Sequence, residues 1–321
     1  MPCFPPNGRP RPLDIDMSFV FHYPTMDSAL TKDGSEKPSI RSDDIPVFDI
    51  RPTSGWRLLD VRELWSYREL VYFLTWRDIK VRYKQTALGV IWVLLQPVAM
   101  MALFTIVFRR VSGVSPDGIP YSIFTLTALL PWQLFSRAIT DSTTSLVTDQ
   151  KLITRVYFPR IIVPISTVLA AIVDFLIASI LLLAIVVYYG IPLHAQIIWT
   201  PVFFVLMIVA ALGTGFWLSA LNVEYRDVSH TIPFLNQFWF FLTPIVYSSS
   251  IVPDRWRFLY SLNPMTGVVE GFRWSILGTA HRPDNVILPS VAVAIVLLIS
   301  GTVWFRRRER TFVDIIGSGS A

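Results

Sequence analysis

Long hydrophobic segments alternate with short polar ones along most of the chain, a pattern that predicts a helical membrane protein. Residues 88–108 form a run of 21 residues without one charge, which is long enough for an α-helix to cross about 30 Å of hydrocarbon. Five further apolar segments follow after short polar connections. The six predicted spans are 88–108, 121–139, 161–189, 197–221, 231–247 and 286–305. The predicted fold class is therefore an all-α integral membrane protein with six transmembrane helices.

The segment just before the first span predicts a helix of another kind, with apolar stripes and basic edges. At 100° per residue, the first stripe contains Trp65, Tyr72, Trp76, Ile79 and Tyr83, and the second contains Tyr67, Leu70, Val71, Leu74 and Val81. Aromatic rings beside Lys and Arg suit the headgroup region of a bilayer. We predict an N-terminal amphipathic interface helix within residues 53–86. From this segment alone, a simple membrane anchor with a positive flank is equally favoured.

Residues 248–278 are too charged to cross a membrane and too apolar for a free loop. Pro253 and Pro264 each stand near the start of a short helical segment. We predict two short re-entrant helices that form an outer gate before the last span, which is allowed only where protein or a watery cavity shelters their backbone. The predicted gate residues are Arg255, Trp256, Glu270 and Arg273. Glu270 and Arg273 are three residues apart, so they are expected to pair on one helical face.

Composition supports a membrane protein, because 53% of the residues are hydrophobic and 16% are charged, against about 25% charged in soluble domains. The net charge of +5 does not indicate nucleic acid, since the basic residues flank apolar spans. The positive-inside rule then places both termini in the cytoplasm, although Arg109 and Arg110 oppose this orientation. A single cysteine excludes an internal disulfide, and the histidines have no metal-ligand spacing. No cleavable signal peptide is expected near Met1.

Four parts are predicted along the chain. Residues 1–52 are rich in proline and charge and are expected to be a disordered cytoplasmic tail. Residues 53–86 hold the interface helix, residues 87–310 form the six-span permease domain, and residues 311–321 are a second cytoplasmic tail. No G-x-x-x-x-G-K-[ST] segment occurs, so the chain lacks a Walker phosphate-binding loop and is not expected to be an ATP-hydrolysing enzyme.

Asp174 is the one acid that lies deep within a predicted span. A charge in that position is costly unless it is paired or hydrated. A helix-packing role is favoured over a proton relay, with Arg137 of the neighbouring span as the proposed partner.

Four segments, taken in order, resemble the permease subunits of ATP-binding-cassette exporters of lipid-linked polysaccharide (O-antigen, capsule and teichoic-acid systems). They are WRDIKVRYKQTALGVIWVLLQP, KLITRVYFPR, ALNVEYRDV and TPIVYSSSIVPDRWRFLYSLNPMTGVVEGFRWSILG. Each is short, but the ordered set is specific and covers about residues 55–305. The resemblance implies a multi-pass protein of the bacterial inner membrane that works as two copies with two separate ATP-binding subunits. Its substrate would be an undecaprenyl-type lipid-linked glycan, and no cofactor is expected on this chain because the partner binds the ATP.

The resemblance also implies residue roles. The expected contacts with the ATPase are Lys151, Arg155, Tyr157, Arg160, Glu224 and Arg226. Arg82 and Lys84 stand at the inner mouth of the first span, where they are expected to attract a diphosphate headgroup; charges that only set topology explain them equally well. The residues expected to line a glycan path are Trp92, Phe104, Phe108, Phe234, Phe238 and Phe241. Lipid-facing bulk explains any single one of these aromatics equally well.

Three other functions stay open at this point. The first is an ABC exporter of another lipid or of a drug on the same scaffold. The second is an integral-membrane transferase that acts on a lipid carrier, which requires acids or a histidine grouped in a polar cleft. The third is a proton-driven transporter, which typically has inverted repeats and several buried ionisable groups.

Overall fold

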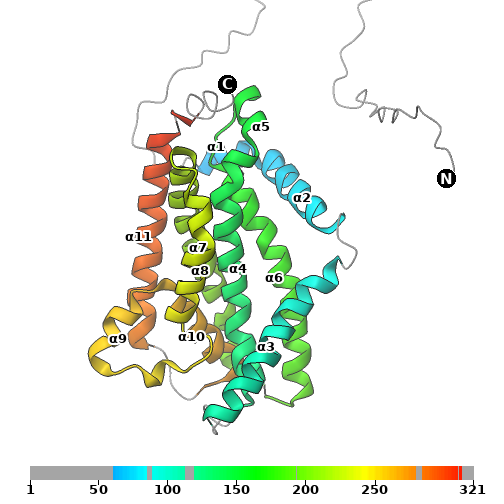
Figure 1. The fold of residues 1–321 in the computed structure, drawn as a ribbon, viewed down its shortest axis with the longest axis vertical. Coiled ribbons are helices and arrows are strands. Elements are labelled where there is room, and N and C mark those ends of the chain that lie inside the picture. Colours follow the sequence, from blue (N-terminus) through cyan, green and yellow to red (C-terminus); the bar gives the residue numbers. More distant parts are fainter. Residues whose placement is uncertain are drawn as a thin grey trace, which may run out of the picture. The chain divides into compact units, whose positions relative to one another are not determined.

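Helices are the only regular elements in the described part of the computed structural model, which comprises residues 61–84, 89–112, 119–192, 194–279, 284–309 and 311–312 (Figure 1). All of these residues belong to one unit, Trp56–Ala321. The all-α prediction is confirmed for these ranges. The tail predicted over residues 1–52 lies outside them, as does the tail over residues 311–321 apart from Thr311 and Phe312.

Three apolar stretches have the length and composition to cross a membrane: Ile162–Tyr188, Ala195–Glu224 and Val286–Arg308. They correspond to α6 (Ile162–Tyr188), to the 3-10 helix η3 (Ala195–Trp199) with α7 (Thr200–Glu224), and to α11 (Asp284–Arg308). A shorter apolar stretch, Ile91–Val107, lies in α3 (Val90–Ser112). These helices match the third, fourth, sixth and first predicted spans.

The longest helix, α4 (Tyr121–Thr148), packs against α3, α6, α7, α8 and α10. Most of its threonines donate their hydroxyls to carbonyls of the same helix; for example, Thr127 donates to the Ile123 carbonyl at 2.8 Å and Thr143 donates to the Ile139 carbonyl at 2.7 Å. Asn222 of α7 donates to the Thr143 carbonyl at 2.9 Å. α4 therefore holds together the helices that surround it.

Glycine allows α7 and α11 to approach closely. A Cβ atom on Gly213 would lie 2.6 Å from the backbone nitrogen of Leu298, and one on Gly301 would lie 2.5 Å from the carbonyl oxygen of Gly213. Small residues at such crossings let two membrane helices pack backbone to backbone. Beside them, the rings of Trp217 and Trp304 stack with centroids 4.8 Å apart.

Two helix ends differ from the prediction. α4 continues to Thr148 rather than ending near residue 139, because Arg137 and Asp141 pair within the helix at 3.6 Å instead of marking its polar exit. α8 (Val228–Leu242) ends before residue 247, since Pro244 offers no N–H and disfavours helical geometry at Thr243. At 15 residues, α8 is only about 22 Å long.

The predicted interface helix is divided into α1 (Val61–Ser66) and α2 (Arg68–Lys84), with a turn at Tyr67. Leu74 is buried and Tyr67, Leu70 and Val71 pack beside it in the same apolar cluster, whereas much of the first predicted stripe is exposed. The exposed members are Trp65, Tyr72 and Trp76. α2 packs against α6. Leu74 and its neighbours in the second stripe thus face the protein, whereas Trp65, Tyr72 and Trp76 of the first stripe face away from it.

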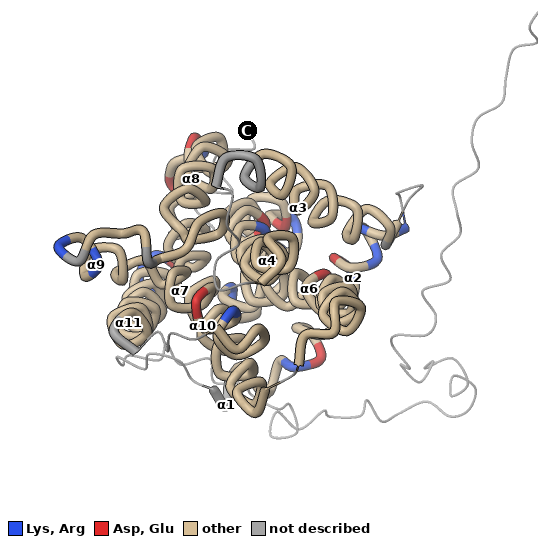
Figure 2. The backbone as a smooth tube through the Cα atoms, turned by 90° about the horizontal axis from the view of Figure 1, so that it is seen from below, with Lys and Arg blue, Asp and Glu red and all other residues tan. Residues whose placement is uncertain are grey.

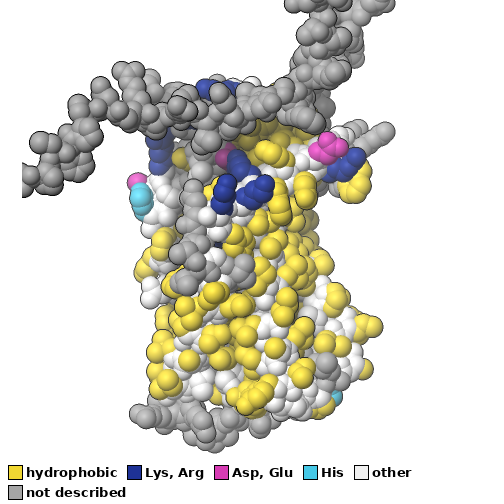
Figure 3. Space-filling model, turned by 90° about the vertical axis from the view of Figure 1, so that its right-hand side faces the viewer, with side chains coloured by type: hydrophobic (Ala, Val, Ile, Leu, Met, Phe, Trp, Pro, Cys, Tyr) yellow, Lys and Arg dark blue, Asp and Glu magenta, His cyan; other side chains and the backbone are white. Residues whose placement is uncertain are grey.

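Consecutive long helices reverse direction. α3 and α6 run toward the end of the helix set where α9 (Asp254–Ser261) and α10 (Pro264–Leu277) lie, and α4, α7 and α11 run back toward α2 and α5 (Gln150–Arg155) (Figure 1). The side face drawn in Figure 3 carries a broad area of hydrophobic side chains, with Lys and Arg gathered toward its upper end. This separation of apolar and basic surface is typical of a membrane protein.

Candidate functional site

A short helix, α5, follows α4, and together with the residues just beyond it carries three of the residues predicted to contact an ATPase. Lys151 and Arg155 are exposed, and Tyr157, just beyond the helix, is 83% exposed. Ile153 faces inward and is buried with Phe158. The apolar side of this segment therefore anchors it, while a tyrosine and two cations project outward.

α5 is also joined to α2. Arg77 of α2 donates to both carboxylate oxygens of Asp149, at 2.6 and 2.9 Å, and to Asp78 at 2.8 Å. Burial acts to lower the pKa of Arg77, but the hydrogen bonds to Asp149 and Asp78 outweigh it and raise the pKa. Bidentate guanidinium–carboxylate pairs are both strong and directional. The start of α5 is therefore held in a fixed position against α2.

Two other predicted docking residues make contacts inside the molecule. The Arg160 N–H donates to Glu309 Oε1 at 2.7 Å, and its guanidinium donates to the Glu309 carbonyl. Glu224 pairs with Arg308 at 2.9 Å. These residues brace the end of α11, whereas Arg226 is exposed. The predicted contacts with an ATPase stay predictions.

A charged cluster, defined here as Arg82, Tyr83, Arg137, Asp141 and Asp174, joins α2 to α4 and α6. Arg82 bonds to Asp141 at 2.7 Å and also to Asp174, and Tyr83 donates its hydroxyl to Asp174. Arg137 lies 3.6 Å from Asp141 and 3.5 Å from Asp174. The predicted pairing of Asp174 with Arg137 is confirmed. Burial, followed by the hydrogen bond to Asp174, raises the pKa of Tyr83, so the phenol stays protonated and donates.

This cluster changes the picture of the inner mouth. Arg82 was expected to attract a diphosphate, but two carboxylates already share its guanidinium and its side chain is only 16% exposed. Sequence reasoning treated α2 as an isolated helix and so could not see these contacts. Lys84, two residues further on, is exposed, and its predicted role stays a prediction.

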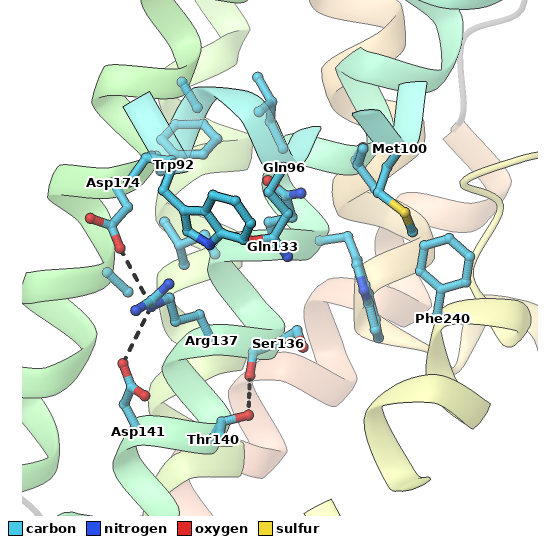
Figure 4. Close-up of a pocket in the computed structure, with 18 residues that line it drawn as sticks. Trp92, Gln96, Met100, Gln133, Ser136, Arg137, Thr140, Asp141, Asp174 and Phe240 are labelled. Atoms are coloured by element: carbon cyan, nitrogen blue, oxygen red, sulfur yellow. Dashed lines mark hydrogen bonds and ion pairs between the residues drawn. The ribbon is translucent and has the colours of Figure 1, made fainter. Parts of the chain in front are cut away.

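A cavity of about 420 Å³ opens beside the cluster, between α3, α4, α6 and α8 (Figure 4). Trp92 and Gln96 of α3 and Gln133 of α4 form one part of its wall, and Figure 4 shows both amides beside the indole. Arg137, Asp141 and Asp174 lie toward one end, while Met100 and Phe240 lie toward the other. Sequence reasoning missed Gln96, Gln133 and Phe240; the signal available was a pair of amides within apolar segments.

The predicted glycan-path aromatics fall into separate groups. Trp92 lines the cavity, and Phe104 stacks on Phe240 of the cavity wall with ring centroids 5.8 Å apart. Three aromatics of α8 instead form an exposed face: Phe234, Phe238 and Phe241. The side chain of Phe108 lies outside the description. The structure thus brings Trp92 and Phe104 to the cavity and places the α8 phenylalanines on a different surface.

The predicted gate residues also divide. Two short helices, α9 and α10, are present, and Arg255 and Trp256 of α9 are exposed, whereas α10 is buried. Figure 2 shows basic positions of α9 at the edge of the helix set and an acidic and a basic position of α10 further in. The predicted pair of Glu270 and Arg273 forms at 3.4 Å. Arg273 is 1% exposed, so the pair belongs to the interior.

Arg273 bonds mainly to backbone. Its guanidinium donates to the carbonyls of Ile245 at 2.8 Å, Phe124 at 3.3 Å and Tyr247 at 3.4 Å, and it lies 3.5 Å from the Phe124 ring centroid. The buried guanidinium thus finds its hydrogen-bond acceptors in three carbonyl groups from two separate segments of the chain. Arg273 is therefore a fixed connection between α10, α4 and the segment after α8.

The long apolar helices and the separation of charge define a multi-pass membrane protein. The chain belongs to the ABC-2 type transporter family, whose model matches residues 69–277. It is 29% identical over 259 residues to an O-antigen export system permease protein RfbA of Myxococcus xanthus, covering 80% of this chain and 98% of that protein. It is 27% identical over 250 residues to an RfbA of Klebsiella pneumoniae, covering 77% and 95%. Similarity also extends to the polysialic acid transport protein KpsM of Escherichia coli, at 25% identity over 246 residues, covering 74% and 92%.

Proposed function

We propose that this chain is the permease subunit of an exporter that moves a lipid-linked polysaccharide across the bacterial inner membrane. The observation that carries the proposal is similarity over nearly the whole length of relatives named for O-antigen export and polysialic acid transport. Membership of the ABC-2 family adds a separate ATPase as the motor. The working assembly contains two copies of this chain and two ATP-binding subunits, and the carrier is an undecaprenyl-type lipid.

The proposed topology has six spans formed by α3, α4, α6, α7, α8 and α11, with α9 and α10 as the outer gate. The alternating directions of the long helices support it, because α2 and the end of α11 then lie at the same end (Figure 1). With that end in the cytoplasm, α2 lies on the inner surface and both termini are cytoplasmic. Residues 1–52 and 311–321 are then tails, 53–86 the interface segment and 87–310 the permease domain.

Docking to the ATPase is assigned to the outward side of α5, namely Lys151, Arg155 and Tyr157, with Arg226 as a second contact. Exposure of an aromatic ring beside two cations supports this role, because aromatic and arginine residues are enriched in protein interfaces. The bond from Arg77 to Asp149 supports a link from α5 to α2. Movement of a docked ATPase would then reach α2 directly.

The function is tested by deleting the gene for this chain. Two quantities are then measured, the glycan on the cell surface and the lipid-linked glycan inside the cell. Loss of surface glycan with accumulation of the lipid-linked form is expected, and restoring the chain should reverse both. Unchanged surface glycan would refute the proposal and favour another lipid or a drug as the substrate.

Docking is tested by combining Lys151→Glu with Arg155→Glu and measuring co-purification of the ATPase. Reversal of both cations is expected to abolish co-purification while the protein remains in the membrane. Arg68→Glu with Lys80→Glu is the matched control, since it makes the same charge change on exposed positions of α2. Normal recovery of the ATPase with the α5 variant would contradict the assignment.

A further inference from the structure

We propose that the cavity between α3, α4, α6 and α8 binds an uncharged sugar ring of the transported glycan, and that it does not bind the diphosphate. This inference rests on the proposed function and adds to it a site with a defined chemical preference. The volume of about 420 Å³ falls within the range of roughly 300–1,000 Å³ that small-molecule sites occupy.

Charge balance argues against an anion site. Arg82 and Arg137 contribute two positive charges at this end of the cavity, and Asp141 and Asp174 contribute two negative ones, all within one network of ion pairs. A diphosphate entering here would compete with Asp141 and Asp174 for the two guanidinium groups and would lie beside the negative charges of both acids. Sugar hydroxyls meet no such repulsion, because they donate to carboxylates and accept from guanidinium groups.

Two glutamine amides in the cavity wall are available to bind hydroxyl groups. Gln96 and Gln133 line the cavity, and neither makes a side-chain hydrogen bond to any other described residue. Gln96 is exposed and Gln133 is half-buried, so both amides are accessible to a molecule that enters the cavity. Each amide offers two donors and one acceptor oxygen, which complements a ring that carries several hydroxyls.

Aromatic surface completes the site. The indole of Trp92 lies beside both amides, and Phe240 lies at the other end of the cavity (Figure 4). Trp92 is 55% exposed, so its ring is accessible for stacking on the apolar face of a pyranose. One aromatic platform with amides beside it and a balanced ion-pair network at the end is a chemistry suited to a neutral carbohydrate.

The test uses the substrate that the cell itself makes. A photoreactive benzophenone amino acid replaces Val93 in the full-length chain, and in two further variants it replaces Ser136, which also lines the cavity, or Phe238, on the exposed face of α8. Cells are irradiated during export, and the purified permease is stained for attached glycan. The same replacement at Val296, an exposed position of α11, is the control. Half of each sample is treated with mild acid, which cleaves the glycosyl–phosphate bond and leaves glycosidic bonds between neutral sugars intact.

We expect glycan on the permease at positions 93 and 136, absent at 296, and still attached after acid treatment. Loss of the stain on acid treatment, with lipid phosphate left on the protein, would mean that the diphosphate occupies the cavity and would overturn the inference. An adduct at position 238 of α8 but at neither cavity position, in cells that still export, would overturn it as well. Because export is scored separately in cells lacking the chain, failure of the proposed function is distinguishable from failure of this site.

Substitution gives a second measurement that needs no photochemistry. Gln96→Leu and Gln133→Leu are each expected to lower the initial rate of glycan export about fivefold, the effect of losing one neutral hydrogen bond. Gln196→Leu is the control, because it removes a half-buried amide of η3 outside the cavity. Rates equal to that of the control, at equal protein abundance, would contradict a role for the amides.

Discussion

Removing the Asp174 carboxylate should release α2 from the membrane helices without unfolding them. Asp174→Asn keeps the size of the side chain but removes the negative charge of the carboxylate that accepts hydrogen bonds from Arg82 and Tyr83. The ion pair between Arg82 and Asp174 is largely buried, since the side chain of Asp174 is 11% exposed and that of Arg82 is 16% exposed. The variant therefore tests whether the charged cluster is what fixes α2 on α6.

The free-energy cost of Asp174→Asn depends on the contacts that Arg82 and Tyr83 keep in the variant. Removing one partner of a buried ion pair typically costs about 3–5 kcal/mol. Asp141 still bonds to Arg82 at 2.7 Å, and asparagine still accepts one hydrogen bond, so we expect the lower end, about 3 kcal/mol. That free energy corresponds to roughly a 100-fold shift in the equilibrium between docked and released α2.

Amide hydrogen exchange on the full-length protein in lipid nanodiscs measures this equilibrium directly. Exchange within α2 should accelerate by up to about 100-fold, while α7 and α11 should exchange as in the unsubstituted protein. Asp227→Asn is the control, because Asp227 is an exposed acid whose side chain does not cap α8. If α2 exchanged at the same rate in both variants, the cluster would not be what holds this helix.

A paired substitution separates loss of the bond from loss of the charge. Arg82→Met combined with Asp174→Leu leaves neither a cation nor an anion without its partner. It should therefore cost less than the sum of the two single changes, because an isolated buried charge is costlier than an apolar pair. Additive losses would show that the two residues act independently.

Three further changes probe the helix packing. Gly301→Val, which forces a side chain into the α7 backbone, should cost about 1–3 kcal/mol and lower the thermal unfolding temperature, while Ala292→Val at an exposed position of the same helix should not. Arg273→Met leaves the half-buried Glu270 without its partner and should cost about 3–5 kcal/mol, whereas Arg255→Met on exposed α9 should change stability by less than about 0.5 kcal/mol. Asp149→Asn should accelerate amide exchange in α5 without affecting α11, and unchanged exchange would show that the bond to α2 does not hold α5.

The hydrophobic pattern was sufficient to predict the long helices because each is a property of a continuous segment. Residues 161–189 predicted α6 almost to the residue, since a long segment that is apolar apart from Asp174 must satisfy its backbone as a helix in a membrane. The end of α4 was predicted wrongly because charge was taken as an exit signal, whereas Arg137 is neutralised by an acid one turn away. The early end of α8 follows from Pro244, a local signal that hydropathy does not weigh.

The charged cluster and the cavity depend on contacts between segments that are distant in the sequence. Arg82 bonds to carboxylates 59 and 92 residues further along the chain, so no projection of α2 alone could reveal them. The amides of Gln96 and Gln133 belong to different helices, and each looked like an isolated polar residue until the structure placed both on one cavity. The pairing of Asp174 with Arg137 was predictable only because a charge within a span needs a counter-charge nearby.

Basic residues in this chain therefore fall into two groups that the sequence alone does not distinguish: those bonded within the protein and those that are exposed. Arg77, Arg82, Arg160 and Arg273 are each bonded to acids or to backbone carbonyls within the protein, where truncation leaves a buried partner unsatisfied. Lys84, Lys151, Arg155 and Arg226 are exposed, where loss of a charge has little effect on the fold. Reversing the charge of a bonded arginine would therefore reduce transport through misfolding. Loss of transport after reversal of an exposed charge instead indicates a lost contact with a partner. Lys151 and Arg155 of the docking variant belong to the exposed set, whereas Arg160 of the same loop is bonded to Glu309.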